Sequence, residues 1–447
     1  MAGELIAQPG SRMHLALSAG VGGVHQGAWR QASSRTEEWG TIGLLTDLAR
    51  QAEGALLDAF FVSDLSQVNR AGLRVQQPYL YFEPLTVLSA LATQTSRIGL
   101  VATASTTFSE PYTLARQVAS LDQISAGRAG WNAVTSSVGS GNYGHHAWPD
   151  HDARYERAEE FLDVVTGLWD SWAPDALIRD RVAGRFADPD RVRPLDHTGT
   201  HFQVAGPLNV PRSAQGRPVI VQAGSSGPGR DLAARHASMV FTAQQDVDES
   251  RAFIRDIRAR AVGFGRSERD VVVLPGLSPV IGDTEADAHR IRDDLLDLVD
   301  EPTAIARLAD QLGGADLTGL GFGDIIPANR LPEVSAVQGR RSRYELFRRL
   351  AVEEQWSVRR LVGLEAASYG HWSISGTAEQ VADAMEERFR AGAADGFIVM
   401  PPSQDALDRF YERVIPLLQA RGLFRTEYEG TTLRDHLGVA APEWPER

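Results

Sequence analysis

The chain has 447 residues and a formal net charge of −13; 43% of its residues are hydrophobic and 23% are charged, which is typical of a large soluble enzyme. It contains no cysteine, which excludes disulfides, thiolate nucleophiles and cysteine-ligated metal centres. It also contains no lysine, which excludes Schiff-base chemistry and a Walker-type phosphate loop, and its acidic charge argues against nucleic acid or an anionic membrane as a partner.

The first half of the chain alternates between short apolar runs and helical patterns. Residues 13–18 predict a strand, 41–55 a helix, 59–63 a second strand that ends on Asp64, and 84–94 a helix with a proline in its first turn. Residues 98–102 and 129–134 predict the third and fourth strands, and 152–172 form the clearest amphipathic helix.

The second half continues the alternation. Residues 218–223, 238–242, 271–280 and 396–400 predict four more strands, and 230–236, 377–390 and 405–420 predict helices, the second of which opens with a Thr-x-x-Gln capping box. Eight strands alternating with helices favour the α/β class and closure into a (β/α)8 TIM barrel. A doubly wound open sheet is the alternative, and the lack of Gly-x-Gly-x-x-Gly after the first strand counts against it.

Two stretches interrupt this pattern. Residues 173–217 are rich in Pro, Gly, Asp and Arg and contain HTGTHFQVAGPLNVP, which predicts a hairpin, whereas 301–371 are long, mostly helical and strongly charged. We interpret both as insertions in a single barrel domain that spans residues 11–422, and we expect 423–447 to be a C-terminal tail that packs on the barrel. No apolar run of about 18 residues and no secretory signal pattern is present, so we predict a cytoplasmic protein.

Functional groups of such a barrel gather where strands end. The segment QAGSSGPGR (222–230) follows the fifth strand, and its small residues, its hydroxyls and the helix N-terminus behind them suit a phosphate, although an ordinary strand–turn–helix would look the same. Asp64 could bind a ligand or cap the next helix, and Asn132 at the end of an apolar strand needs a polar partner. His145, His146 and His151 lack the spacing of a metal site, and we predict no metal.

Several of these same segments carry a family resemblance. The chain resembles the nitrilotriacetate monooxygenase, pristinamycin synthase and dibenzothiophene-sulfone monooxygenase group of the bacterial luciferase-like superfamily. The matching stretches cover nearly the whole chain from about residue 11 to 440: 25–30 (HQGAWR), 60–64 (FFVSD), 83–136, 142–144 (NYG), 151–161 (HDARYERAEEF), 197–237 and 427–438.

The resemblance implies a TIM barrel that takes FMNH2 from a separate NAD(P)H-dependent flavin reductase, reacts it with O2 to give a peroxyflavin, and so oxygenates a small organic substrate. The resemblance places flavin contacts on Asp64, Thr103, His151, Tyr155, Ser225 and Ser226. From their positions in the fold, Asn132, Thr135 and Gly224 are also expected to contact the flavin. His25 and His371 are the candidates for substrate-side proton transfer, because an imidazole titrates near neutral pH.

Other functions remain open on this basis. A deazaflavin (F420)-dependent oxidoreductase shares the superfamily barrel, a flavin-binding protein without turnover could use the same site, and a phosphate-binding isomerase or aldolase could use the same fold. We expect a homodimer or a homotetramer and a transient contact with the reductase. The substrate is not identified by the sequence, because residues 301–371, which are expected to help form its pocket, match the family least.

Overall fold

The structure, a computed structural model, describes residues 11–20, 22–70, 72–76, 82–136, 138–144, 151–337 and 341–445. Eight parallel strands form a closed ring in the order β1-β2-β3-β4-β7-β8-β9-β11, in which β11 pairs with β1. The strands are β1 (His14–Ser18), β2 (Ala59–Val62), β3 (Gly99–Ser105), β4 (Ala129–Val134), β7 (Val219–Gln222), β8 (Met239–Thr242), β9 (Val272–Ile281) and β11 (Gly396–Val399). The predicted (β/α)8 barrel is therefore confirmed.

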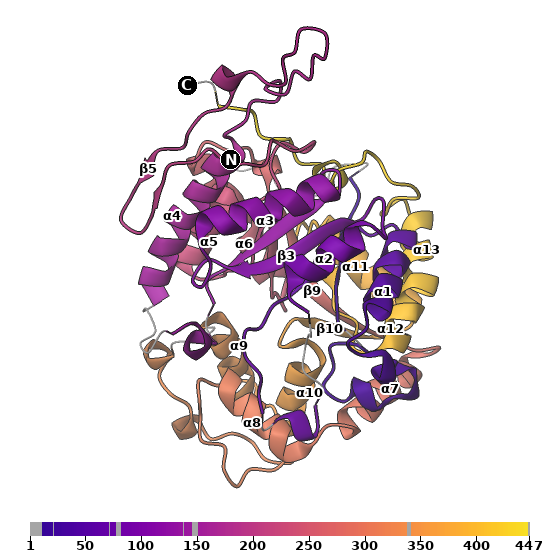
Figure 1. Cartoon of the computed structure of the whole chain (residues 1–447). Helices are drawn as coiled ribbons and strands as arrows, with labels where there is room; N and C mark the ends of the chain where they lie inside the picture. The colour runs from indigo at the N-terminus through magenta and orange to yellow at the C-terminus, as the bar shows by residue number, and fades with distance from the viewer. Residues whose placement is uncertain are drawn as a thin grey trace, which may run out of the picture.

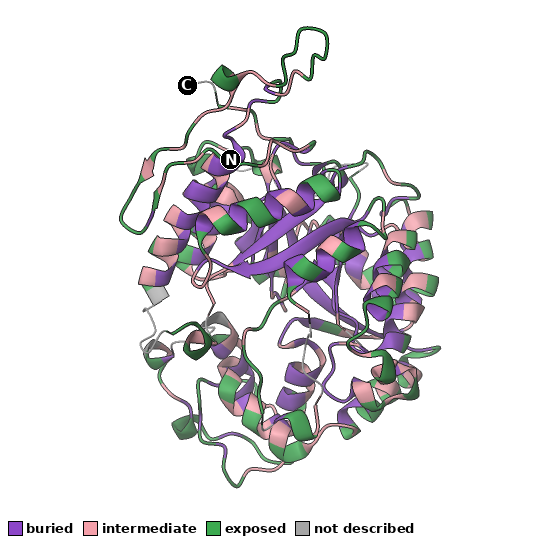
Figure 2. Cartoon of the chain, viewed as in Figure 1, coloured by how far each residue is buried: buried purple, intermediate pink, exposed green. Residues whose placement is uncertain are grey.

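The ring is covered by helices on its outside (Figure 1). They are α1 (Ile42–Gly54), α2 (Pro84–Ala92), α3 (Pro111–Ile124), α4 (His151–Trp169), α5 (Gly227–His236), α6 (Val247–Gly263), α7 (Glu285–Asp297), α11 (Ala378–Arg390), α12 (Gln404–Arg409) and α13 (Ile415–Ala420). A π-helical stretch, Phe410–Val414, joins the last two. Because helices lie outside the strands and side chains fill the barrel, the strands are buried almost throughout (Figure 2), which explains their continuous apolar runs.

Local signals in the sequence account for several helix starts. The side chain of Thr41 accepts the Leu44 amide at the start of α1, and Glu83 accepts two amides ahead of Pro84 at the start of α2. The predicted capping box of Thr377 and Gln380 is present at α11. Helices α3, α6 and α7 complete the alternation at positions that the sequence analysis did not assign.

A ninth strand, β10 (Trp372–Gly376), was not predicted. It pairs in parallel with the second half of β9, outside the closed ring. Only the two ends of this short strand are buried, so it lacks the apolar run by which the other strands are recognised.

Two stretches interrupt the alternation of strands and helices, and we keep the name insertions for them. The first contains an antiparallel hairpin of β5 (His197–Thr198) and β6 (Gln203–Val204). The second contains α8 (Glu301–Gln311), α9 (Arg341–Val352) and α10 (Val358–Ser368), which lie at the lower side of Figure 1. These helices share a separate apolar cluster that includes Leu308, Tyr344, Phe347 and Leu361. The second insertion therefore packs on a core of its own beside the carboxyl ends of the strands.

The C-terminal segment closes the opposite, amino end of the barrel. Helix α14 (Leu433–Leu437) places Leu433 and Leu437 among barrel residues such as Val101 and Val219. A Cβ atom on Gly99 would lie 2.4 Å from Leu433 Cδ1, so the contact requires a glycine there. In the described part of the chain, no helix has both the length and the apolar character needed to span a membrane.

Candidate active site

A cavity of about 550 Å³ opens at the carboxyl ends of the strands. We call it the main cavity, and eight of the nine residues expected at the flavin line it: Asp64, Thr103, Asn132, Thr135, Tyr155, Gly224, Ser225 and Ser226. The ninth, His151, is the first residue of α4, and its side chain lies outside the described structure, as do His145 and His146. The structure thus brings together residues that are up to 162 positions apart between Asp64 and Ser226.

Adjacent strands fix one wall of the main cavity. Thr103 on β3 lies in register with Asn132 on β4, so their side chains share one face of the sheet. Asn132 Nδ2 donates to Thr103 Oγ1 at 3.0 Å, and both side chains are buried. Asn132 Oδ1 is buried without a hydrogen-bond partner among the described residues. A buried carbonyl oxygen in this state at a cavity wall can accept a hydrogen bond from a molecule bound in the cavity.

The turn between β7 and α5 forms the neighbouring wall, because β7 pairs directly with β4. Ser226 is the N-cap of α5, and its hydroxyl accepts the Gly229 amide at 3.3 Å. A Cβ atom on Gly224 would lie 2.9 Å from the Cα atom of Gly229, so small residues are needed for this turn to fold back on its helix. The Gly224 amide is used inside the turn, because it donates to the side chain of Gln222. Gly224 therefore shapes the turn, and the serines and the helix N-terminus are groups that can bind an anion.

Tyr155 and two arginines complete this end of the cavity. A Cβ atom on Gly229 would lie 3.0 Å from the Tyr155 hydroxyl, which places that hydroxyl beside the turn. Arg230 Nε donates to the Ser225 carbonyl at 2.9 Å while its Nη1 pairs with Asp256 at 2.9 Å. Arg154 is buried and lines the same cavity. The turn is thus flanked by two guanidinium groups, which suits a phosphate.

Asp64 does not cap a helix. It follows β2, accepts the amide of the next residue, Leu65, and the next helical turn begins only at Gly72. Burial raises the pKa of Asp64 above its ordinary value, and the carboxylate of Glu83 adds to the effect. The side chain instead lies between two cavities.

A second cavity, of about 300 Å³, adjoins the first, and we call it the side cavity. The two cavities share Ser63, Asp64, Leu65, Phe241 and His371. The side cavity is further lined by polar groups such as His25, Asn69, Gln76 and Arg307 and by apolar groups such as Val24 and Met400. A ligand in the main cavity and a second one in the side cavity would therefore meet at Asp64 and His371.

His25 lines the side cavity from the loop after β1. Its neighbour Gly23 has a φ of +107° and lies so close to the Pro402 carbonyl that a Cβ atom would be 2.3 Å from it, which holds this loop against the one after β11. His25 Nδ1 accepts the Gly27 amide at 3.1 Å, so the ring proton is on Nε2. Burial lowers the pKa of His25 to about 4, and the ring is neutral at pH 7.

His371 faces both cavities and has the opposite tautomer. Its Nδ1 donates to the Thr242 carbonyl at 3.2 Å, and its Nε2 accepts from Arg343 Nη2 at 3.2 Å. The ring stacks on Phe241, with centroids 4.6 Å apart and planes 4° apart. A Cβ atom on Gly276 would lie 2.4 Å from Nδ1, so this position also requires a glycine. At rest, His371 is an acceptor that is already occupied by Arg343.

Comparisons with known proteins agree with this geometry. Residues 22–395 match the family described as luciferase-like monooxygenase. Nitrilotriacetate monooxygenase component A of Aminobacter aminovorans is 43% identical over 445 residues, which cover 97% of this chain and 97% of that protein. The chain belongs to the luciferase-like monooxygenase family.

Two further relatives extend the comparison. N-acetyl-S-(2-succino)cysteine monooxygenase of Bacillus subtilis (strain 168) is 42% identical over 425 residues, 94% of this chain and 95% of that protein. The structure of EDTA monooxygenase (EmoA) from Chelativorans sp. BNC1 superposes with a TM-score of 0.84 at 34% identity and covers 97% of this chain and 100% of that one. The chain is a flavin-dependent monooxygenase of the two-component type, and the alternative of an F420-dependent oxidoreductase is less well supported.

Sequence reasoning missed three arginines of the main cavity: Arg154, Arg230 and Arg343. Two of them had a signal, because Arg154 is next to Tyr155 and Arg230 ends the segment QAGSSGPGR. In a chain without lysine, any cation near a phosphate must be an arginine. Arg343 had no such signal, since it reaches the cavity from helix α9 of the second insertion.

Proposed function

We propose that this protein is the oxygenase component that binds reduced FMN in the main cavity and a small organic substrate in the side cavity. Reduced FMN supplies the electrons with which O2 is activated and one oxygen atom is transferred to the substrate. The residues that we propose as flavin contacts are Asp64, Thr103, Asn132, Thr135, His151, Tyr155, Gly224, Ser225 and Ser226. The observation that carries this proposal is that Asn132 Oδ1, buried and unpartnered among the described residues, lines the same cavity as a phosphate-type turn.

The residues present fit that cofactor. A volume of about 550 Å³ lies within the range of roughly 300–1,000 Å³ that small-molecule sites occupy. The N-terminus of α5, its serines and Arg230 would hold the phosphate, while Asn132 would accept a hydrogen bond from the ring system. Gly224 would keep the turn narrow enough for the phosphate to approach the backbone.

His25 and His371 have different proposed roles. Because His25 is neutral with its proton on Nε2, it would donate a hydrogen bond to the substrate or to the oxygen being transferred, without carrying a charge. His371 would act as a base only after Arg343 moves from its Nε2 atom. Both rings line the side cavity, and His371 also lines the main cavity, so either ring could contact a substrate in the side cavity.

Arg307 indicates a class of substrate to test first. It lines the side cavity, pairs with the buried Glu365 at 3.0 Å and donates to Gln76 at 3.1 Å. A guanidinium has five N–H donors, so Arg307 can still donate to a carboxylate in the side cavity while it binds Glu365 and Gln76. Two of the relatives are named for nitrilotriacetate and EDTA, which are polycarboxylates. We propose a carboxylate-bearing small molecule as substrate.

The proposal predicts a separate reductase. The purified protein with NADH, FMN and substrate should give no product, and the addition of any NAD(P)H-dependent flavin reductase should start turnover. Incorporation of oxygen-18 from labelled O2, measured over a panel of carboxylates, sulfones, sulfides, lactams and alkanes, identifies the substrate. Rapid NADH oxidation by the protein alone, or flavin-independent product formation, would contradict the proposal. We also propose that the protein works in the cytoplasm as a homodimer or homotetramer.

A further inference from the structure

The first insertion contains a projecting segment, residues 177–188, which we call the arm. It leaves the end of α4 and stands beyond the helices at the top of Figure 1. Its own hydrogen bonds shape it: the Ile178 amide donates to the Phe186 carbonyl at 3.0 Å, and Asp180 and Arg185 exchange backbone bonds of 2.8 and 3.0 Å. The Asp180 carboxylate accepts the Val182 and Ala183 amides at 2.9 Å each. The arm is therefore an ordered hairpin.

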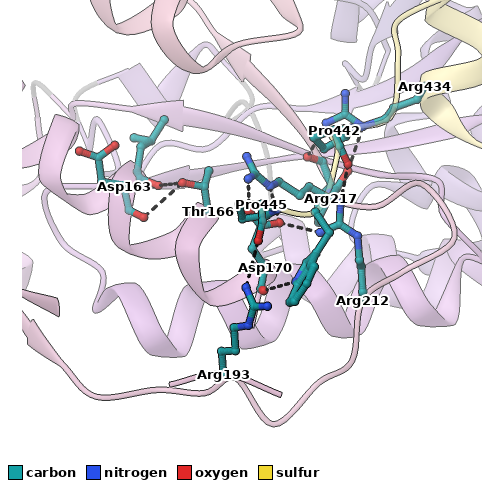
Figure 3. A network of polar contacts seen from close by, with 12 residues as sticks. Asp163, Thr166, Asp170, Arg193, Arg212, Arg217, Arg434, Pro442 and Pro445 are labelled. Carbon is teal, nitrogen blue, oxygen red and sulfur yellow. Dashed lines mark hydrogen bonds and ion pairs between the residues drawn. The ribbon is translucent and has the colours of Figure 1, made fainter. Parts of the chain in front are cut away.

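The base of the arm is fastened to the barrel (Figure 3). Arg212 Nη1 and Arg217 Nε donate to the Asp170 carboxylate at 2.6 and 2.7 Å, next to the end of α4. Trp444 of the C-terminal segment donates to the Asp170 carbonyl at 2.9 Å, and Arg193, on the strand that returns from the arm, lies 3.8 Å from the Trp444 ring centroid. This network holds the arm at a fixed angle to the barrel.

The tip of this fixed arm is apolar as well as exposed. Val182 is 100% exposed and Phe186 is 71% exposed, which are the two highest values among the large hydrophobic residues that the structure describes as exposed. In Figure 2 the tip of the arm, residues 179–186, is drawn as exposed, and the residues at its base are intermediate. An ordered valine and phenylalanine that no described residue of the same chain covers gain free energy when another molecule covers them.

The charge of the tip selects among possible partners. Residues 179–186 contain three arginines and one aspartate, whereas the whole chain has a net charge of −13. A basic tip is attracted to an acidic molecule, and a second copy of this chain is acidic overall, with a net charge of −13. An anionic membrane would also attract the tip, but it would repel the rest of this acidic protein.

We propose that the arm is a contact through which one copy of this protein binds a second copy. Val182 and Phe186 enter an apolar site on the partner, and Arg179, Arg181 and Arg185 pair with acidic groups around it. This contact is independent of the flavin assignment, because α4 runs from the cavities at its first residue to the arm at its last. The arm thus lies at the amino end of the barrel, away from both cavities.

The test measures the mass of the full chain in solution by sedimentation velocity and light scattering. The wild type should have a multiple of 48.6 kDa, and Val182→Ser/Phe186→Ser should have a lower multiple at the same concentration. Loss of two central apolar residues should raise the dissociation constant by about thirtyfold or more. Arg181→Glu/Arg185→Glu should weaken association too, and raised salt should weaken the wild type in the same direction.

Matched controls separate the contact from general surface effects. Ile42→Ser removes an apolar side chain that is 45% exposed at the first residue of α1, and it should leave the mass unchanged. FMNH2 binding per chain should be equal in all variants, so a failed oligomer test would contradict the proposed homodimer or homotetramer but not the proposed flavin binding and oxygenation. A monomeric wild type at tens of micromolar, or an unchanged mass in both arm variants, would overturn the proposal. So would arm-dependent binding to vesicles of anionic phospholipid with no change of mass.

Discussion

At the amino end of the barrel, the carboxylate of Asp58 is fully buried and its hydrogen bonds all come from this chain: Leu15 N at 2.6 Å, His14 Nδ1 at 3.2 Å and Arg425 Nη2. At the carboxyl end, Asn132 Oδ1 is buried with no such partner among the described residues. One of these two buried polar groups is hydrogen-bonded within the chain, and the other has no partner among the described residues. The Asp58 carboxylate helps to hold the C-terminal segment in place, whereas the Asn132 oxygen lies at a cavity that could admit a ligand.

The difference follows from how a parallel barrel is built. Strand ends at both openings leave backbone and side-chain groups that need partners. The C-terminal segment supplies these at the amino end, where Arg434 Nε donates to the Arg217 carbonyl at 3.1 Å and the Leu433 amide donates to Gly127. The carboxyl end is instead lined by loops and by the second insertion, which leave the main cavity and the side cavity among others. Stability and binding should therefore respond to different substitutions, and four predictions test this.

The largest effect is expected from Arg425→Leu. The substitution leaves the Asp58 carboxylate buried without its cation, which costs about 3–5 kcal/mol in the free energy of unfolding. Urea unfolding of the flavin-free protein measures it. The control is Arg12→Leu, which removes an ion pair with Glu429 whose side chains are 47% and 75% exposed, and it should cost at most about 1 kcal/mol. FMNH2 affinity of the folded fraction should stay the same in both variants, and a large loss of affinity would undo the proposed division between the two ends.

The second effect concerns the turn before α5. Ser225→Ala/Ser226→Ala removes hydroxyl donors to a charged phosphate, each worth roughly 1.5–3 kcal/mol, so FMNH2 affinity should fall about a hundredfold. Because Ser226 also caps α5, the double variant should lose about 1 kcal/mol of stability, and Ser225→Ala alone should not. Anaerobic titration with FMNH2 and with reduced riboflavin decides the outcome. Equal losses for the two ligands would show that the turn is only structural.

The third effect concerns Asp64, which lies between the two cavities. Asp64→Asn replaces an acceptor-only group with one that presents two donors, and FMNH2 affinity should fall by roughly 1–3 kcal/mol. The melting temperature of the flavin-free protein should change little, because no helix depends on this side chain as a cap. Anaerobic binding beside a melt of the apo protein measures both quantities. Unchanged affinity would remove Asp64 from the proposed flavin contacts.

The smallest effect concerns pH at the amino end. Burial, with a contribution from Arg425, lowers the pKa of His436 to about 4, below its unfolded value of about 6.5. The neutral ring therefore contributes stability above pH 6.5, and this contribution is lost as the pH falls toward 4. The slope is about 1 kcal/mol per pH unit between pH 6 and 5. His436→Phe should remove this slope and leave those of His25 and His236, whose pKa values are lowered to about 4 and 3.

Chemical unfolding at pH 7, 6 and 5 measures that slope, and the quantity to compare is the change with pH, because the phenylalanine also alters packing. FMNH2 affinity per folded molecule should show no matching difference between His436→Phe and the wild type. An identical pH slope in the two proteins would mean that His436 does not titrate in this range. The Asp58–Arg425 pair would then be the main test of whether polar groups at the amino end stabilise the fold without affecting flavin binding.

The sequence by itself determined the barrel, since eight buried strands give apolar runs and their helices give periodic patterns, start signals and a capping box. It also predicted eight of the residues that line the main cavity, because parallel strands end at one edge and residues such as Asp64, Asn132 and Ser225 each follow or end a strand.

Only the tertiary structure decided what these residues can do. The burial of His25, the Arg343 partner of His371 and the unpartnered Asn132 Oδ1 depend on groups that are distant in sequence. The same holds for β10, whose middle residues are too exposed to give an apolar run, and which pairs with the part of β9 that extends beyond the ring. Local sequence sets periodicity and caps, whereas protonation, pairing and access to a cavity are set by the neighbours that folding brings into contact.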